Sequence, residues 1–151
     1  MPLLATATDA KSAPNVGVYR LATYGLFAAI VAMVVNSAIL VVTIEALGVP
    51  AGFPLSWGPV LASSVVPAVG ATVVYATVAR VSRRPNRAFA LVATLVLGLS
   101  FVPFVSPPPE LSGAPQSVFV TLGAMHVAAA VAIVGLLSRV PQRTASAGES
   151  P

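Results

Sequence analysis

The chain alternates between four long apolar runs and short segments rich in polar residues, proline or arginine. The runs cover residues 21–47, 57–79, 88–106 and 116–138. Helices of 19 to 27 residues span roughly 28 to 40 Å, and the hydrocarbon core of a bilayer is about 30 Å thick. Open sheets cannot face lipid, and the runs are too long and too evenly apolar for barrel strands. The pattern therefore predicts an all-α fold, a bundle of four antiparallel transmembrane helices within residues 19–140.

The composition predicts the same class of protein. Apolar residues make up 57% of the chain and charged residues 8%, with a mean hydropathy of +0.93. A soluble domain of this composition would lack a solvated surface. Four spans leave only short loops and two tails, and the chain has no phosphate-binding glycine loop, zinc-binding histidine pair or paired carboxylates. We therefore expect a membrane protein that is not an enzyme.

Lysine and arginine lie on alternate sides of the four runs. The connection between the second and third runs is strongly basic, and the other two connections contain no lysine or arginine. Because short basic loops stay in the cytoplasm, the pattern predicts that both termini are cytoplasmic and that the basic connection is the orientation signal. The predicted location is the plasma membrane of a prokaryote. The orientation signal consists of Arg80, Arg83, Arg84 and Arg87.

The net charge of +4 follows from this orientation and from contact with anionic headgroups. The expected partner is therefore the lipid bilayer, and nucleic acid is not expected.

Residues 1–18 and 141–151 are polar or small and lack an apolar period, so they are predicted to be disordered cytoplasmic tails. Residues 48–56 contain two prolines and two glycines, which end one helix and delay the next until Trp57.

Five polar residues lie within the runs at similar predicted depth, at or just outside the middle of the bilayer. A polar side chain at this depth needs a partner or a cavity. One alternative is an interhelical hydrogen-bond clamp, with bonds of roughly 0.6 to 2 kcal/mol each. A ligand or ion site is the second, and serines bonded to their own helix are the third. This predicted polar layer comprises Asn36, Ser63, Ser64, Ser100 and His126.

His126 is the single histidine, and imidazole is the side chain whose charge changes near neutral pH. A proton or cation pathway normally recruits an acidic partner, but Glu45 lies near the outer end of its run and is expected to be interfacial. Haem binding would need a second axial ligand, which the chain itself does not offer. With no cysteine in the chain, thiolate metal sites are excluded. We expect no cofactor and no metal.

Small residues and prolines suggest how the helices pack and bend. Helix backbones approach closely in lipid where side chains are short. Pro67 and Pro103 each remove a backbone hydrogen bond and are expected to kink a helix or open a polar notch. The expected packing stripes are Ala28, Ala32 and Asn36 in the first helix, Ala68, Thr72 and Ala76 in the second, and Ala124, Ala128 and Ala132 in the fourth.

Several short motifs resemble those of a domain-of-unknown-function family of small four-helix membrane proteins from actinobacteria and haloarchaea. The resemblance covers roughly residues 18–140 and implies the four-helix topology, with Asn36, Ser100 and His126 singled out. It implies no particular activity. The motifs are Asn36 in a run ending at residues 46–50, residues 87–89 leading to 99–103, and residues 125–129.

Two functions from different classes remain after these observations. The leading one is a structural or accessory membrane subunit, with a homo-oligomer or a membrane protein as possible partner. The alternative is a small transporter or an ion- or ligand-binding bundle that uses the polar layer around His126 and Asn36. A water-accessible cavity reaching His126 favours the alternative, and a dry, closed bundle favours the subunit.

Overall fold

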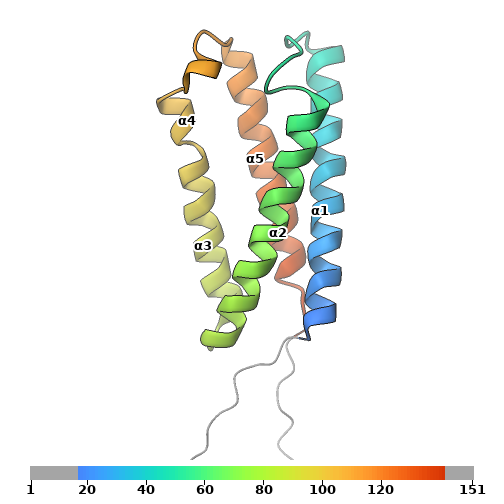
Figure 1. Cartoon of the computed structure of the whole chain (residues 1–151), viewed down its shortest axis with the longest axis vertical. Helices are drawn as coiled ribbons and strands as arrows, with labels where there is room; N and C mark the ends of the chain where they lie inside the picture. Colours follow the sequence, from blue (N-terminus) through green and yellow to red (C-terminus); the bar gives the residue numbers. More distant parts are fainter. Residues whose placement is uncertain (1–16, 142–151) are drawn as a thin grey trace, which may run out of the picture.

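The computed structural model describes residues 17–141, so most of the two predicted tails lies outside the described residues. Within this range the chain is helical, and each predicted run corresponds to a helix or to two consecutive helices (Figure 1). The elements are α1 (Val18–Val41), a π-helical turn (Val42–Ala46), α2 (Trp57–Val81), α3 (Pro85–Ser100), α4 (Val102–Val105), a 3-10 turn (Pro109–Leu111) and α5 (Gln116–Leu137).

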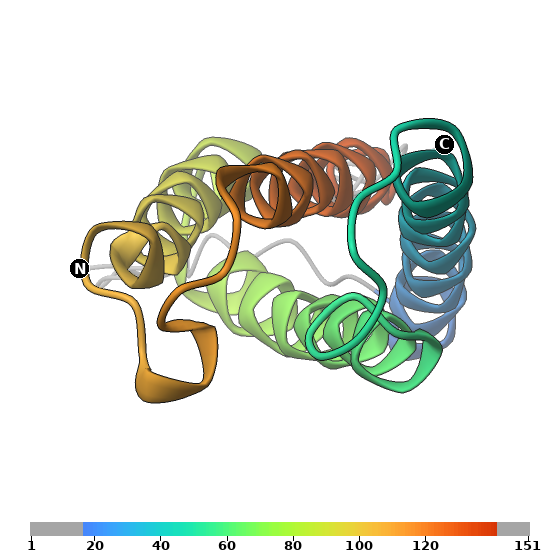
Figure 2. The ribbon, with the colours of Figure 1, turned by 90° about the horizontal axis from the view of Figure 1, so that it is seen from above.

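Four helical spans are long and apolar enough to cross a membrane. They are Val18–Ala46, Trp57–Val81, Pro85–Val105 and Gln116–Leu137. The all-α class and the four apolar helices are therefore confirmed. In Figure 1 the chain runs up α1, down α2, up α3 and α4, and down α5. Viewed from above, α2 and α5 lie between α1 on one side and α3 on the other (Figure 2).

The ends of the helices follow local chemistry. The third span begins three residues before the predicted start at 88, because Pro85 occupies the first turn of α3, where no backbone N–H is needed. The same span is split near Pro103, since α3 ends at Ser100 and α4 starts at Val102. The proline expectation therefore holds at Pro103. At Pro67, by contrast, α2 continues without interruption.

The core lies mainly between α1, α2 and α5. One buried cluster lies toward the arginine-rich end and contains Tyr75, Phe89 and Leu137. A second cluster, toward the other end, contains Leu40 and Met125. In α3, by contrast, only Pro85 and Phe89 are buried among the residues of that helix. The third span is therefore peripheral to a tighter group of three helices.

The connection 48–56 does more than separate two helices. Val49 and Leu55 are buried and pack in the same cluster as Leu40 and Met125. The loop turns back on itself through Gly52, whose φ of 137° is accessible to glycine and strained for other residues. Its backbone pairs with Leu55, with the Gly52 N–H donating to the Leu55 carbonyl at 3.2 Å. This loop therefore covers the end of the core.

The small-residue stripes are partly as expected. In α1, Ala28, Ala32 and Asn36 are all buried, and α1 packs along α2. In α5 the expectation is wrong, because Ala124 is exposed. The buried face of α5 is one position around the helix, where the larger Met125 and Ile133 fill the space between helices. The residues buried on this face are Val118, Thr121, Met125, Ala129, Ile133 and Leu137.

Candidate functional site

One hydrogen bond between helices is formed by the predicted polar residues. The Asn36 Nδ2 group on α1 donates to the Ser64 Oγ atom on α2 at 3.0 Å. Ser64 in turn donates to the carbonyl of Val60 at 2.7 Å, which orients its hydroxyl to accept from Asn36. The two residues are 2% and 0% exposed. Asn36 and Ser64 therefore connect α1 and α2 through a buried contact.

The other end of the Asn36 side chain has no partner. Its Oδ1 atom is the one buried side-chain oxygen or nitrogen without a hydrogen-bond partner within residues 17–141. A buried unpaired acceptor costs about 1 to 3 kcal/mol, because it has lost water and gained nothing in return. Chemically, this carbonyl oxygen offers a single acceptor to a donor small enough to enter the core.

The remaining polar residues form hydrogen bonds with their own helices. The Ser63 side chain is exposed and donates to the carbonyl of Val60 at 3.1 Å. Ser100 donates to the carbonyl of Leu97 at 2.6 Å. A carbonyl three or four residues earlier is always within reach on a helix, so it competes with any partner on a neighbouring helix. For both residues the nearby carbonyl provides the hydrogen bond.

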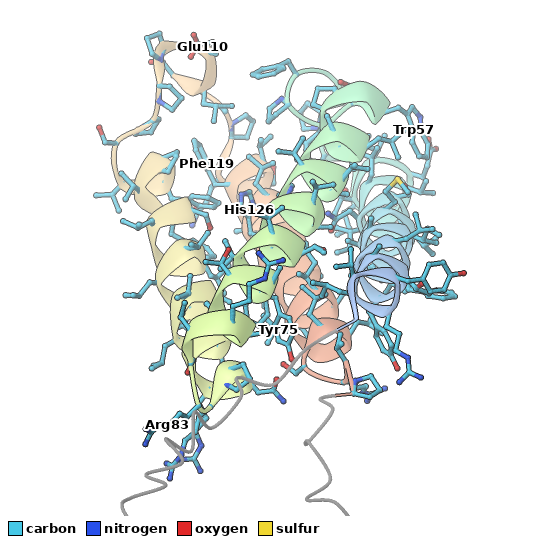
Figure 3. All side chains as sticks on the ribbon, turned by 60° about the horizontal axis from the view of Figure 1, so that its bottom comes forward. Trp57, Tyr75, Arg83, Glu110, Phe119 and His126 are labelled. Atoms are coloured by element: carbon cyan, nitrogen blue, oxygen red, sulfur yellow. The ribbon has the colours of Figure 1, made fainter. Side chains whose placement is uncertain are left out.

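His126 is half-buried and behaves in the same way. Its Nδ1 atom lies 2.7 Å from the carbonyl of Leu122, one turn earlier on α5. Because a carbonyl only accepts, Nδ1 carries the hydrogen in this contact. The rings of Phe101 and Phe104, from the α3–α4 junction, have their centroids 6.3 Å from the imidazole. The ring therefore lies on the side of α5 next to that junction (Figure 3).

Direct hydrogen bonds thus join only Asn36 and Ser64 among the five residues of the predicted polar layer. Asn36 contacts α2, whereas the aromatic neighbours of His126 belong to the α3–α4 junction. A bridge between these two side chains through water remains a prediction.

An apolar groove of about 910 Å³ lies beside the α3–α4 junction. Phe101 and Phe104 form one wall, and Phe119 and Gly123 of α5 form the other. Its remaining lining residues are Ala114, Gln116, Val120, Ala124, Val127 and Ala128, so neither Asn36 nor His126 lines it. The groove is an aromatic surface beside α5, and its wall residues Phe101 and Phe104 are also the aromatic neighbours of His126.

A polar connection at the opposite end was not anticipated from the sequence. The Tyr75 hydroxyl donates to Asn86 Oδ1 at 2.7 Å, and Asn86 Nδ2 donates to the carbonyl of Ser138 at 3.0 Å. The Tyr75 ring, 0% exposed, also meets Phe89 edge to face at 5.1 Å between centroids. This Tyr75–Asn86–Ser138 connection ties α2, the start of α3 and the end of α5 together. The feature of the sequence that could have indicated this connection is the single tyrosine, Tyr75, within the apolar helix α2.

The four arginines of the predicted orientation signal lie at this same end. Arg80, Arg83, Arg84 and Arg87 are all exposed. Arg83 and Glu110 lie at opposite ends of the molecule in Figure 3. Within the described part of the chain no three His, Cys, Asp or Glu side chains gather in a way that could hold a metal ion.

By length and composition, the four helical spans place the chain among the multi-span helical membrane proteins. A family model matches residues 17–143, and the chain belongs to this family, DUF6069, a family of unknown function. No match was found among curated proteins or among solved structures. The family match covers the whole helical region and adds no activity to it.

Proposed function

We propose that this protein is a structural or accessory subunit of a prokaryotic plasma membrane and has no enzymatic activity. In this proposal the four helices form an antiparallel bundle with both ends in the cytoplasm. Its surroundings are lipid and either further copies of the chain or another membrane protein. The exposed apolar side chains of α3, such as Leu91 and Leu95, suit such surroundings.

The observation that carries this proposal is how the buried polar groups are used. Ser64 and Asn36 bond to each other, and Ser100 and His126 bond to carbonyls of their own helices. Each of these bonds satisfies a group that lipid cannot satisfy. The first bond joins α1 to α2 and the other two stay within one helix, so these groups do not converge on a substrate.

One observation favours the alternative, a small transporter or an ion- or ligand-binding bundle. The unpaired Oδ1 atom of Asn36 is a carbonyl-type acceptor, the kind of group that coordinates small cations or accepts from a bound molecule. A single acceptor is much less than an ion site, which needs several oxygens. The alternative therefore requires partners beyond those that Asn36 has in this structure.

Substitutions of Asn36 and His126 distinguish the two functions. For a structural role, Asn36→Ala is expected to cost about 1 to 2 kcal/mol, because it removes the bond between α1 and α2. His126→Leu is expected to cost less than about 1 kcal/mol, since the Leu122 carbonyl keeps its helical backbone bond. The free energy of unfolding is measured in mixed detergent and SDS micelles, with circular dichroism monitoring the loss of helix. His126→Gln is the matched control and is expected to be close to the native protein.

Measurements of proton and cation flux in proteoliposomes also test the proposed structural function, because the alternative function is transport. Wild-type protein is expected to carry no proton or cation flux above that of protein-free vesicles. Flux in the wild type that disappears in folded His126→Gln and Asn36→Ala variants would establish the transporter instead. A greater loss of stability for His126→Leu than for Asn36→Ala would contradict the assigned roles of the two side chains.

The basic connection between α2 and α3 is expected to determine the orientation. Replacing Arg80, Arg83, Arg84 and Arg87 together by glutamine removes the residues that retain this loop in the cytoplasm. We expect a mixed or inverted population, measured by protease or reporter fusions at the carboxyl end. A variant with the four arginines changed to lysine is the control and should insert as the native chain does. Unchanged orientation in the glutamine variant would show that other residues determine it.

A further inference from the structure

Charge is divided between the two ends of the bundle. The described arginines lie near the start of α1, in and beside the α2–α3 turn, and after α5, whereas the two described carboxylates, Glu45 and Glu110, lie in the π-helical turn after α1 and in the 3-10 turn before α5. Figure 3 shows Arg83 and Glu110 at opposite ends of the molecule. No carboxylate therefore lies near the arginines within residues 17–141, and their charge is not neutralised by this part of the chain. The exposed arginines at this end are Arg20, Arg80, Arg83, Arg84, Arg87 and Arg139.

The Tyr75–Asn86–Ser138 connection brings some of these arginines together. Asn86 and Ser138 are 52 residues apart in the chain and are joined by a 3.0 Å hydrogen bond. Arg87 directly follows Asn86, and Arg139 directly follows Ser138. The backbones that carry these two arginines are therefore held side by side, although they belong to α3 and to the end of α5.

The neighbouring turn is also held by its own bonds. The Ser82 Oγ atom accepts from the backbone N–H of Arg84 at 3.1 Å, so the turn that carries Arg83 and Arg84 is shaped before α3 begins. Four exposed arginines therefore lie close in the chain to this connection, two in the turn before Asn86 and two directly after Asn86 and Ser138. These four residues, Arg83, Arg84, Arg87 and Arg139, are called the arginine site below.

An apolar stripe on α3 leads away from this site. Leu91 and Leu95 follow Arg87 at four-residue steps, so the three side chains lie on one side of the helix. Both leucines point away from the bundle, with 69% and 68% of their surfaces exposed. A molecule with a negatively charged head and a hydrocarbon chain can therefore contact Arg87 and the stripe together.

We propose that the arginine site binds an anionic phospholipid with two phosphates in its headgroup, whose acyl chain lies along Leu91 and Leu95. Guanidinium groups bind phosphate oxygens through paired N–H donors, and four of them match two phosphates better than one. Basic sites between helix ends at a membrane surface bind such headgroups. This inference rests on the proposed membrane function, because only membrane insertion places the site at headgroup depth.

The test is lipid binding to the purified full-length protein in detergent, measured by native mass spectrometry. The probes are a lipid in which two phosphatidyl groups share one glycerol, phosphatidylglycerol at the same phosphate concentration, and phosphatidylcholine. We expect the two-phosphate lipid to bind about tenfold or more tightly than phosphatidylglycerol, and phosphatidylcholine to bind least. Equal binding of the two anionic lipids per phosphate would overturn the two-phosphate assignment.

Variants separate the arginine site from charge in general. Arg87→Gln combined with Arg139→Gln is expected to remove the preference, whereas Arg20→Gln combined with Arg80→Gln, which removes the same charge outside the site, is expected to keep it. Circular dichroism confirms that each variant is folded. An unchanged preference in the first variant would overturn the site. Displacement of the lipid by millimolar inorganic phosphate or pyrophosphate would show a free-phosphate site instead.

This experiment does not depend on the orientation of the protein in a cell, because both ends are accessible in detergent. A failure of lipid binding with correct insertion would therefore reject the arginine site and leave the proposed function standing. Flux in proteoliposomes together with intact lipid binding would reject the proposed structural function and leave the arginine site standing.

Discussion

Replacing Tyr75 by alanine is expected to lower the free energy of unfolding by about 3 kcal/mol, the largest effect of a single truncation in this chain. The side chain is fully buried, packs edge to face on Phe89, and supplies the hydroxyl that orients Asn86. Alanine removes all of these contacts and leaves a cavity where α2, α3 and α5 meet. Unfolding in mixed detergent and SDS micelles, followed by circular dichroism, measures the change.

Tyr75→Phe separates the ring from its hydroxyl. Phenylalanine keeps the ring beside Phe89 and removes the hydroxyl that donates to Asn86, so we expect a loss of about 1 kcal/mol. Val73→Ala is the matched control, because this residue of the same helix is 60% exposed. A loss for Tyr75→Ala no greater than that for Val73→Ala would contradict the role assigned to the Tyr75–Asn86–Ser138 connection.

Gly25→Val is expected to have the second-largest effect, a loss of about 1 to 3 kcal/mol from overpacking. A Cβ atom at Gly25 would overlap the Thr72 side chain and lie 2.9 Å from its Cγ2 atom. The Thr72 hydroxyl is also engaged, since it donates to the carbonyl of Ala68 at 2.7 Å. The side chain therefore has little freedom to move, and α1 and α2 have to separate. The same detergent unfolding assay measures the loss.

Two further variants identify the cause of this loss. Gly70→Val makes the same change in helix propensity at an exposed glycine of α2 that has nothing within 4 Å of an added Cβ atom, so it should cost little. Adding Thr72→Ala to Gly25→Ala removes the two nearest atoms and should restore much of the stability lost by Gly25→Ala alone. Equal losses for the two glycine positions would show that close helix contact is not the reason.

Hydrophobic length was enough to predict the four helices, because a bilayer leaves few alternatives for runs of this size. Several ends of the spans differ from the predicted runs by one to three residues, and the start of α3 does so because a proline occupies its first turn. The face of α5 was less predictable. Alanine occurs on several faces of α5, so the positions of the small residues did not show which face is buried. The buried face carries Met125 and Ile133.

The polar residues show where sequence reasoning reaches its limit. Depth in the span identified Asn36 and Ser64, and these two residues bond to each other. Depth alone does not show toward which neighbouring helix a side chain points. His126 was therefore grouped with Asn36, although the aromatic neighbours of His126 are Phe101 and Phe104. The carbonyl of Leu122 also competes for the imidazole, and the sequence does not weigh one partner against another.

Contacts between segments distant in the chain were not predictable. Asn86 follows a proline in a basic turn and has the composition of an ordinary loop residue, yet it bonds to Tyr75 and to the carbonyl of Ser138. Leu55 lies in a loop without an apolar period, yet it is buried at the end of the core. Both depend on how the helices are arranged in three dimensions, which periodicity within one segment does not encode.

Single-cysteine labelling tests the central claim, four membrane spans with both ends in the cytoplasm. The chain contains no cysteine, so one engineered thiol reports one position. Suitable sites are Gly17, Arg83 and Pro141, all at the predicted cytoplasmic side, and Glu110 in the α4–α5 connection. All four residues are exposed.

In intact cells, an impermeant maleimide is expected to label the Glu110→Cys variant and to spare Gly17→Cys, Arg83→Cys and Pro141→Cys. After permeabilisation all four should be labelled, which shows that each thiol is reactive. Labelling of Arg83→Cys in intact cells while Glu110→Cys is spared would contradict the orientation. Labelling of Gly17→Cys but not Pro141→Cys would contradict an even number of spans.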